Sequence, residues 1–186
     1  DDGKGGSIPC YNEAGTLVAP AVYLGRTVPK VTGGFNATLT LFDNIRIFSQ
    51  FDFQTGFSKL DGNFRVRCLL FSLCRENHMP QDYDPVYIAE IQGGGTFPGV
   101  TIARADFLKL REVSVAYTLP SSWAARFGAR SASINLAGRN LYTFTDYMGL
   151  EPESGFNSGD RGGFSLFEQN VLPQLAQFVA SLNVSF

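Results

Sequence analysis

The sequence has few of the residues on which catalytic and metal sites usually depend. It contains one Trp, one His and three Cys among 186 residues. His78 lies in no serine-protease or hydrolase motif, so a Ser-His-Asp triad is not supported. Three cysteines are an odd count, which does not fit a disulfide framework. The composition therefore predicts neither an enzyme nor a bound cofactor.

An excess of charge and a long apolar run are also missing. The 15 Lys and Arg residues nearly balance 17 Asp and Glu residues, and the net charge of −2 argues against a nucleic-acid partner. No apolar run approaches the length of about 18 residues that a transmembrane helix needs. A barrel strand would escape this test, because its apolar residues alternate with polar ones. The chain begins at Asp1 without Met or a signal peptide, so we expect a fragment or a processed product.

Alternation is the dominant pattern that is present, and it is clearest in residues 176–186. Successive strand side chains point to opposite faces, so one face of this strand is apolar and the other is mostly polar. Its apolar face carries Phe178, Ala180, Leu182, Val184 and Phe186. A transmembrane β-barrel can end on such a strand, with the apolar face in contact with lipid.

Four further stretches show the same alternation. Residues 33–41 and 45–57 flank a tight turn at Asp43 and Asn44, which predicts a β-hairpin. Residues 106–119 and 131–144 predict two more strands. The phase of the first of these is ambiguous, because Lys109 and Arg111 share a face with Val113 and Val115. Either a bulge shifts the phase, or the two basic residues lie at the height of the lipid headgroups.

The connections between these strands alternate in length. Those at 43–44 and 120–130 are short, the second with a helical turn at 121–127 that Gly128 ends. Those at 58–104 and 145–175 are long, with a short helix predicted within 64–77. Short turns on one side and long loops on the other are typical of outer-membrane barrels. The predicted fold is all-β, an antiparallel meander that forms the C-terminal strands of a transmembrane β-barrel. It is incomplete, because five strands fall short of the roughly eight that a small barrel needs.

Several motifs resemble one family in order and spacing. Residues 106–120 read DFLKLREVSVAYTLP and resemble the F-L-R-L-x-N-x-x-L-x-Y-x-L-P stretch of SusC/RagA-type TonB-dependent transporters. Residues 138–145 and 149–153, GRNLYTFT and GLEPE, are similar to their G-x-N-L-x-x-x-T and G-x-D-P-E segments, with Glu151 in place of Asp. Gly25, Pro29-Lys30 and Gly33-Gly34 match the opening of a late hairpin, and the last five residues resemble the end of the family.

This resemblance implies a large plugged barrel that imports oligomeric glycans or peptides. A SusD-like surface lipoprotein would cover its outer face, and TonB would act through an N-terminal region that this chain lacks, as it lacks the plug. The resemblance also implies that the barrel assembly machinery recognises the terminal Phe186 as an assembly signal. The acidic D-x-N-x-D-G loop of many members is matched only by Asp1-Asp2-Gly3-Lys4, which does not establish a calcium site.

Two sets of site residues follow. We expect one set to face outer-membrane lipid: Ile45, Ile47, Phe51, Phe53, Ile134, Leu136, Phe178, Leu182 and Val184. Substrate contact is assigned to Arg139 on the opposite face, and to Tyr147 and Phe164 in the last long loop. Ring bodies also favour headgroup depth, so aromatic residues at strand ends fit interface girdles.

Other interpretations stay open at this point. Cys68, Cys74 and His78 could ligate zinc, but their spacing fits no standard finger, and buried thiols or a disulfide explain the two cysteines as well. Glu151 and Glu153 could be the paired carboxylates of a glycosidase, but they lie only two positions apart in a loop that contains Pro. The main rival is a soluble β-sandwich that binds carbohydrate, in which the apolar faces would pack on each other. The sequence does not set the state of Cys10.

Overall fold

A computed structural model describes residues 13–15, 23–92, 98–153 and 167–186. Their contacts divide the chain into two compact units. The first, called the sheet unit, comprises residues 29–55, 106–146 and 173–186. The second, called the loop unit, comprises residues 1–28, 56–105 and 147–172. Among the described residues, no helix is both long and apolar enough to cross a membrane.

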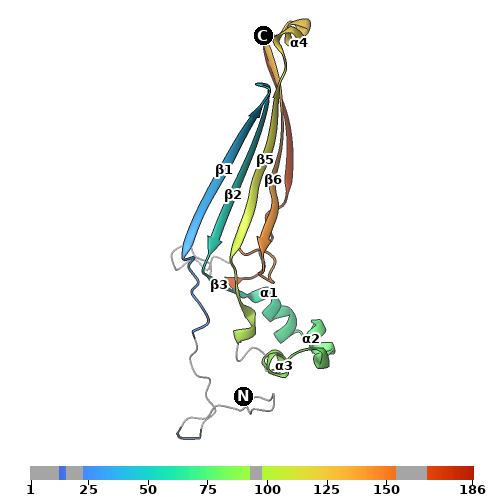
Figure 1. Cartoon of the computed structure of the whole chain (residues 1–186). Coiled ribbons are helices and arrows are strands. Elements are labelled where there is room, and N and C mark those ends of the chain that lie inside the picture. The colour runs from blue at the N-terminus through green and yellow to red at the C-terminus, as the bar shows by residue number, and fades with distance from the viewer. Residues whose placement is uncertain (1–12, 16–22, 93–97, 154–166) are drawn as a thin grey trace. The chain divides into compact units, whose positions relative to one another are not determined.

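The sheet unit is a five-stranded antiparallel sheet (Figure 1). Its order is β1 (Val31–Leu41), β2 (Ile45–Thr55), β5 (Phe107–Thr118), β6 (Ser131–Thr145) and β8 (Gln177–Ser185). Each strand pairs with the one before it, so the predicted meander is confirmed. Over the described strands the sheet does not close on itself, which makes the fold an all-β, incomplete barrel.

The two short connections form as the sequence predicts. Phe42 and Asp43 take positive φ values of 51° and 59°, and the N–H of Asn44 donates to the carbonyl of Leu41. The second connection holds α4 (Ser121–Ala124) and η4 (Ala125–Phe127). Gly128 ends this helical turn with a φ of 73°, a left-handed conformation that glycine adopts without a steric cost.

The loop unit contains structure that the alternation did not reveal. Its small sheet has the order β4 (Ile102–Arg104), β3 (Ser58–Asp61) and β7 (Phe167–Glu168), with β7 parallel to β3. Its helices are α1 (Gly62–Phe64), the π-helix η1 (Arg65–Leu70), α2 (Arg75–His78), η2 (Pro80–Asp82), α3 (Pro85–Gln92) and η3 (Pro98–Thr101). Phe64, Cys68, Leu69, Cys74 and Ile91 form its apolar core.

The helix predicted within 64–77 is interrupted. The chain leaves the helical path after Leu70, where Ser72 has a φ of 52°, and resumes at Arg75. Asp61 begins the first helical segment, since its carboxylate accepts a hydrogen bond of 2.9 Å from the N–H of Phe64.

Candidate functional site

The strand register gives the five-stranded sheet one continuous apolar face. Residues directly opposite each other in an antiparallel pair share a face. Phe51 of β2 lies opposite Phe35, and their rings stack with centroids 4.9 Å apart. The remaining strands continue the face through these opposed pairs: Ile47 and Val115, Leu136 and Val115, Ile134 and Leu182, Ala132 and Val184.

A β-bulge resolves the ambiguous phase of β5. Gln50 pairs with Glu112, but the next residue, Phe51, pairs with Leu110, so Arg111 is the extra residue. The neighbouring strand is also irregular at this level, because the register between β5 and β6 shifts between Leu110 and Glu112. The extra residue inverts the alternation, so Leu108 and Leu110 join Val113 and Val115 on the apolar face. Lys109 and Phe107 consequently lie on the other face.

Many side chains of the apolar face are exposed to solvent in the chain as it stands. Leu136, Phe178 and Leu182 are 56%, 82% and 67% exposed. Ile45, Ile47, Phe51 and Phe53 of β2 are partly buried. Side chains packed inside a two-sheet sandwich would be buried, so this exposure disfavours the soluble sandwich.

The opposite face carries ion pairs between neighbouring strands. The Arg111 guanidinium contacts the Asp52 carboxylate, with Nε 2.7 Å from Oδ2, and its Nη1 donates to the Gln174 side chain at 3.2 Å. Arg139 pairs with Glu112, with Nε 2.9 Å from Oε2. The Arg139 side chain is 54% exposed, so it is accessible despite this pair, and its role in substrate contact stays a prediction.

The loop unit holds a second group of polar residues, which is buried. Glu168 of β7 is fully buried and accepts hydrogen bonds from the N–H groups of Leu150 and Glu151, at 3.0 and 3.3 Å. The Asn63 side chain also donates to this carboxylate, at 3.2 Å. Glu168 thus fixes the backbone of the GLEPE motif. Gly149 opens this motif, where a Cβ would collide with the Tyr147 ring and the Glu168 carboxylate.

Lys59 of β3 supports the same motif from another strand. It is 3% exposed, and its Nζ donates to the Pro152 carbonyl at 2.9 Å. Burial lowers the pKa of Lys59, because an ammonium loses hydration, while the carboxylates of Glu168, Glu151 and Glu153 act in the opposite direction. We call Lys59, Asn63, Gly149, Glu151 and Glu168 the motif clamp. It joins segments that lie about 90 residues or more apart in the chain.

Tyr147 packs beside this clamp. Its side chain is 5% exposed, and burial together with the charge of Glu168 raises the pKa of its phenol. Stacking on a sugar would require the ring to become exposed, so its role in substrate contact stays a prediction. Phe164, the third predicted contact residue, lies outside the described residues.

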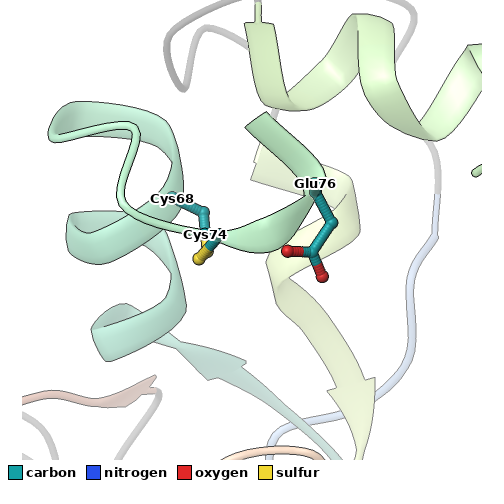
Figure 2. Close-up of side chains that lie close together, drawn as sticks. All are labelled: Cys68, Cys74 and Glu76. Atoms are coloured by element: carbon teal, nitrogen blue, oxygen red, sulfur yellow. A yellow bond between two sulfur atoms is a disulfide. The ribbon is translucent and has the colours of Figure 1, made fainter. Parts of the chain in front are cut away.

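Two of the three candidate zinc ligands form a disulfide. Cys68 and Cys74 are bonded to each other, which confirms the disulfide among the interpretations left open for these two residues (Figure 2). Their sulfurs and a Glu76 oxygen lie within 4.8 Å of one another, but a disulfide offers no thiolate to a metal. His78 does not join this group. Cys10 lies outside the described residues.

The sequence did not identify the buried charges of the loop unit. Lys59, Asp61 and Glu168 are each at most 9% exposed, and each stands in a stretch that reads as a polar loop. The G-L-E-P-E match was the only available signal, because it indicated that this loop has a defined conformation.

Comparisons with known proteins agree with this fold. No family model matches the chain. TonB-dependent receptor P3 of Formosa agariphila is 29% identical over 84 residues, which cover 44% of this chain and 8% of that receptor. TonB-dependent receptor P26 of the same organism is 24% identical over 189 residues, which cover 89% of this chain and 18% of the receptor. The chain therefore spans a small part of the curated relatives that it matches.

Solved structures of the RagAB peptide importer have the same fold. The "closed-closed" state matches 95% of this chain and 20% of that chain, with a TM-score of 0.68 and 22% identity. The "open-open" state matches 95% and 19%, with a TM-score of 0.65 and 23% identity. The fold of this chain and the apolar face of its sheet together define a segment of an all-β barrel. The resemblance to SusC/RagA-type TonB-dependent transporters is confirmed by both the sequence matches and these structures.

Proposed function

We propose that this chain is the C-terminal barrel portion of a TonB-dependent transporter in a bacterial outer membrane. The whole transporter imports an oligomeric nutrient, a glycan or a peptide. The observation that carries the proposal is the five-stranded meander, whose continuous apolar face accompanies a fold match over 95% of the chain. An apolar outer face and a polar inner face are the defining pattern of transmembrane barrels.

In this proposal the apolar face lies against lipid and the polar face lines the lumen. Exposure in water then becomes burial in hydrocarbon, which stabilises the sheet by the hydrophobic effect. Tyr142 and Phe144 end the apolar face on β6, with ring centroids 4.6 Å apart, and fit an interface girdle. The ion pairs of Arg111 and Arg139 line the lumen, where water or the plug would contact them.

The transporter would act with partners that the chain itself does not contain. A SusD-like surface lipoprotein covers the outer side, and TonB supplies energy through the N-terminal region. Support comes from the fold that the chain shares with the RagAB peptide importer and from the TonB-dependent receptors matched in sequence. Recognition of Phe186 by the assembly machinery stays a prediction.

Fractionation and uptake test this function together. In cells that produce the full-length transporter, the protein should stay in the outer membrane through an alkaline carbonate wash. Uptake of a labelled oligopeptide or oligosaccharide should depend on both the transporter and TonB. Release by the carbonate wash would favour a soluble binding module, and uptake that persists without TonB would contradict the energy source.

A further inference from the structure

The disulfide of the loop unit is enclosed by the fold. Cys68 is fully buried and Cys74 is 5% exposed. Both residues lie in the apolar core of the unit, with Phe64, Leu69 and Ile91. Thiol–disulfide exchange requires that the attacking sulfur reach the sulfur of a second molecule. A protein that exchanges disulfides cannot reach either cysteine in this fold, so the bond must form before the loop unit closes around it.

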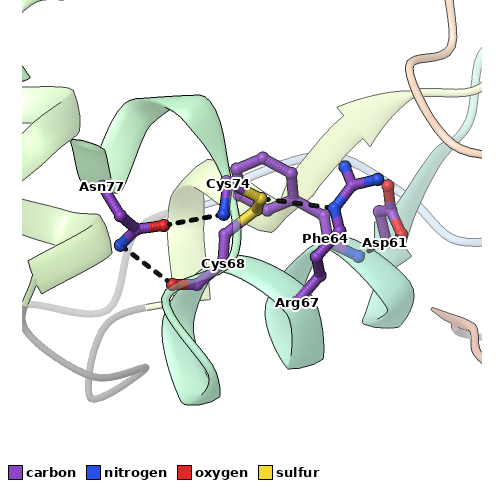
Figure 3. The surroundings of a disulfide bond; sticks show 6 residues. All are labelled: Asp61, Phe64, Arg67, Cys68, Cys74 and Asn77. Atoms are coloured by element: carbon purple, nitrogen blue, oxygen red, sulfur yellow. Dashed lines mark hydrogen bonds between the residues drawn. A yellow bond between two sulfur atoms is a disulfide. The ribbon is translucent and has the colours of Figure 1, made fainter. Parts of the chain in front are cut away.

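The contacts that bring the two cysteines together are local. Cys74 lies six positions after Cys68 and is the N-cap of α2. The Asn77 side chain donates to the Cys68 carbonyl at 3.1 Å and accepts from the Cys74 N–H at 3.3 Å (Figure 3). The Nε of Arg67 donates to the Cys74 sulfur at 3.3 Å. Residues 67–77 therefore contain these partners, and a loop of roughly ten residues closes in about 10–100 ns.

The cysteines lie within the connection between two neighbouring strands of the five-stranded sheet. β2 ends at Thr55 and β5 begins at Phe107, and the two strands pair along their length. Contacts between residues far apart in sequence form more slowly than local ones, because closing a long loop costs entropy. The pairing of Cys68 with Cys74 is therefore expected to precede the pairing of β2 with β5.

Each cysteine has an arginine as its neighbour in the sequence. Residues 67–75 read RCLLFSLCR, and this stretch contains no acidic residue. A positive charge beside a cysteine favours the thiolate, which is the nucleophile of disulfide exchange. In the unfolded chain both cysteines are thus suited to attack the disulfide of another protein.

We propose that a periplasmic thiol oxidase, a protein with an exchangeable disulfide, oxidises Cys68 and Cys74 before the barrel enters the outer membrane. This inference rests on the proposed function, because a protein bound for the outer membrane crosses the periplasm, where disulfides form. One cysteine thiolate attacks the oxidase disulfide, forms a mixed disulfide and releases an oxidase thiolate. The second thiolate attacks the sulfur of the first and displaces the oxidase. Two electrons pass to the oxidase, whose disulfide becomes a dithiol and takes up the two protons that the cysteines lose.

Differential alkylation of the full-length transporter tests this order. Cells are quenched with acid, the denatured protein is alkylated, and trypsin cleavage after Arg67 and Arg75 releases residues 68–75, which exclude Cys10. This peptide carries two alkyl groups if the thiols are free and none if the disulfide has formed. In cells depleted of the barrel assembly machinery, the transporter held in the periplasm should yield the unalkylated peptide. In cells without a periplasmic thiol oxidase, newly made transporter should yield the doubly alkylated peptide for minutes to hours, the time of uncatalysed disulfide chemistry.

The assembled transporter provides the matched test of burial. In isolated outer membranes, dithiothreitol should leave the disulfide intact, so that residues 68–75 stay unalkylated. Heating in detergent before the same treatment should give the doubly alkylated peptide, because the sulfurs are then accessible. Rapid reduction without heating would show that an oxidase can reach the cysteines in the fold, and early oxidation would lose its physical reason.

Two further results would overturn the inference. One is doubly alkylated peptide from the transporter held in the periplasm of cells that have the oxidase, because oxidation would then follow insertion. The other is equally rapid oxidation with and without the oxidase, because no protein partner would then be needed. A transporter that is released by the carbonate wash but yields the oxidised peptide would instead contradict the proposed function, and oxidation by the periplasmic partner would stand.

Discussion

The Arg111 guanidinium contacts the Asp52 carboxylate across two strands, with Nε 2.7 Å from Oδ2, and Arg111 is also the extra residue of the bulge in β5. One residue therefore both shifts the side-chain phase of its strand and links that strand to its neighbour. Without the shift, Leu108 and Leu110 would lie on the polar face and Lys109 on the apolar one. The apolar face is continuous across β5 because Arg111 is left out of the pairing with β2.

Deletion of Arg111 should preserve the two faces of β5, whereas an added residue should not. Without Arg111, Glu112 and Leu110 become neighbours and still lie opposite Gln50 and Phe51, so the alternation continues in the same phase. The deletion and Arg111→Ala both lose a partly exposed ion pair and one side-chain hydrogen bond, at a cost of about 1 kcal/mol. An Ala inserted between Lys109 and Leu110 should impair assembly strongly, because it moves Lys109 to the apolar face. The measurement is the folded fraction in outer membranes by heat-modifiable gel mobility. A folded fraction as low for the deletion as for the insertion would show that Arg111 is not the extra residue.

Leu182→Arg and Asn183→Arg separate the two faces of β8. Leu182 lies opposite Ile134 on the apolar face, and Asn183 lies opposite Ser133 on the other. Arginine near the midplane of the lipid face costs about 2–4 kcal/mol, whereas lumen positions tolerate polar change. We expect Leu182→Arg to impair assembly of the full-length transporter and Asn183→Arg to be mild. If Leu182→Arg folds as well as Asn183→Arg, the lipid-facing assignment is wrong.

Removing the Glu168 carboxylate should loosen the GLEPE motif. Glu168→Ala leaves the N–H groups of Leu150 and Glu151 without this acceptor, at about 1–3 kcal/mol for the buried N–H of Glu151 and less for the partly buried N–H of Leu150. Glu168→Gln keeps the side-chain shape and one acceptor oxygen, so it can accept from only one of the two N–H groups. Amide hydrogen exchange should accelerate at both 150 and 151 in the Ala variant and at only one of these positions in the Gln variant. Unchanged exchange in the Ala variant would show that Glu168 does not hold the backbone of the GLEPE motif.

Tyr147 should make the loop unit sensitive to alkaline pH. Its pKa is raised in the folded state above the ordinary value of 10.0, so above that pH the phenol ionises in the unfolded chain but resists ionisation in the fold. Stability contributed by the neutral phenol is present below pH 10 and declines above it. Tyr147→Phe should reduce this decline in urea unfolding monitored in the loop unit. Tyr142→Phe is the control, because Tyr142 is 59% exposed, and it should leave the decline of stability above pH 10 unchanged.

The sheet could be predicted from the sequence because its signal is local. Alternation alone gave β1, β2, β6 and β8 nearly to their ends, and the positive φ at Asp43 agrees with the turn expected there. The position of the bulge at Arg111 could not be assigned, because a bulge is defined by its pairing with a neighbouring strand. The resemblance to a family then supplied what alternation could not, namely the type of barrel.

The loop unit could not be predicted, because its contacts are non-local. β3 and β7 pair through two residues each, Leu60 with Phe167 and Asp61 with Glu168, and such short strands leave no period to detect. The motif clamp brings Lys59 and Glu168 to one loop from distant positions, and both residues read as surface charges. The disulfide was only one of several interpretations of Cys68 and Cys74, because cysteine spacing does not fix pairing.

The order of the sheet has a consequence for handling the polypeptide of residues 1–186 by itself. Within the described residues, β1 and β8 each pair with a strand on one side only. Their outer rows of N–H and C=O groups are then templates for strands of other molecules, next to a broad apolar surface. In water the isolated polypeptide should aggregate edge to edge, and charged detergent or added strands on both sides should be needed to keep it monomeric.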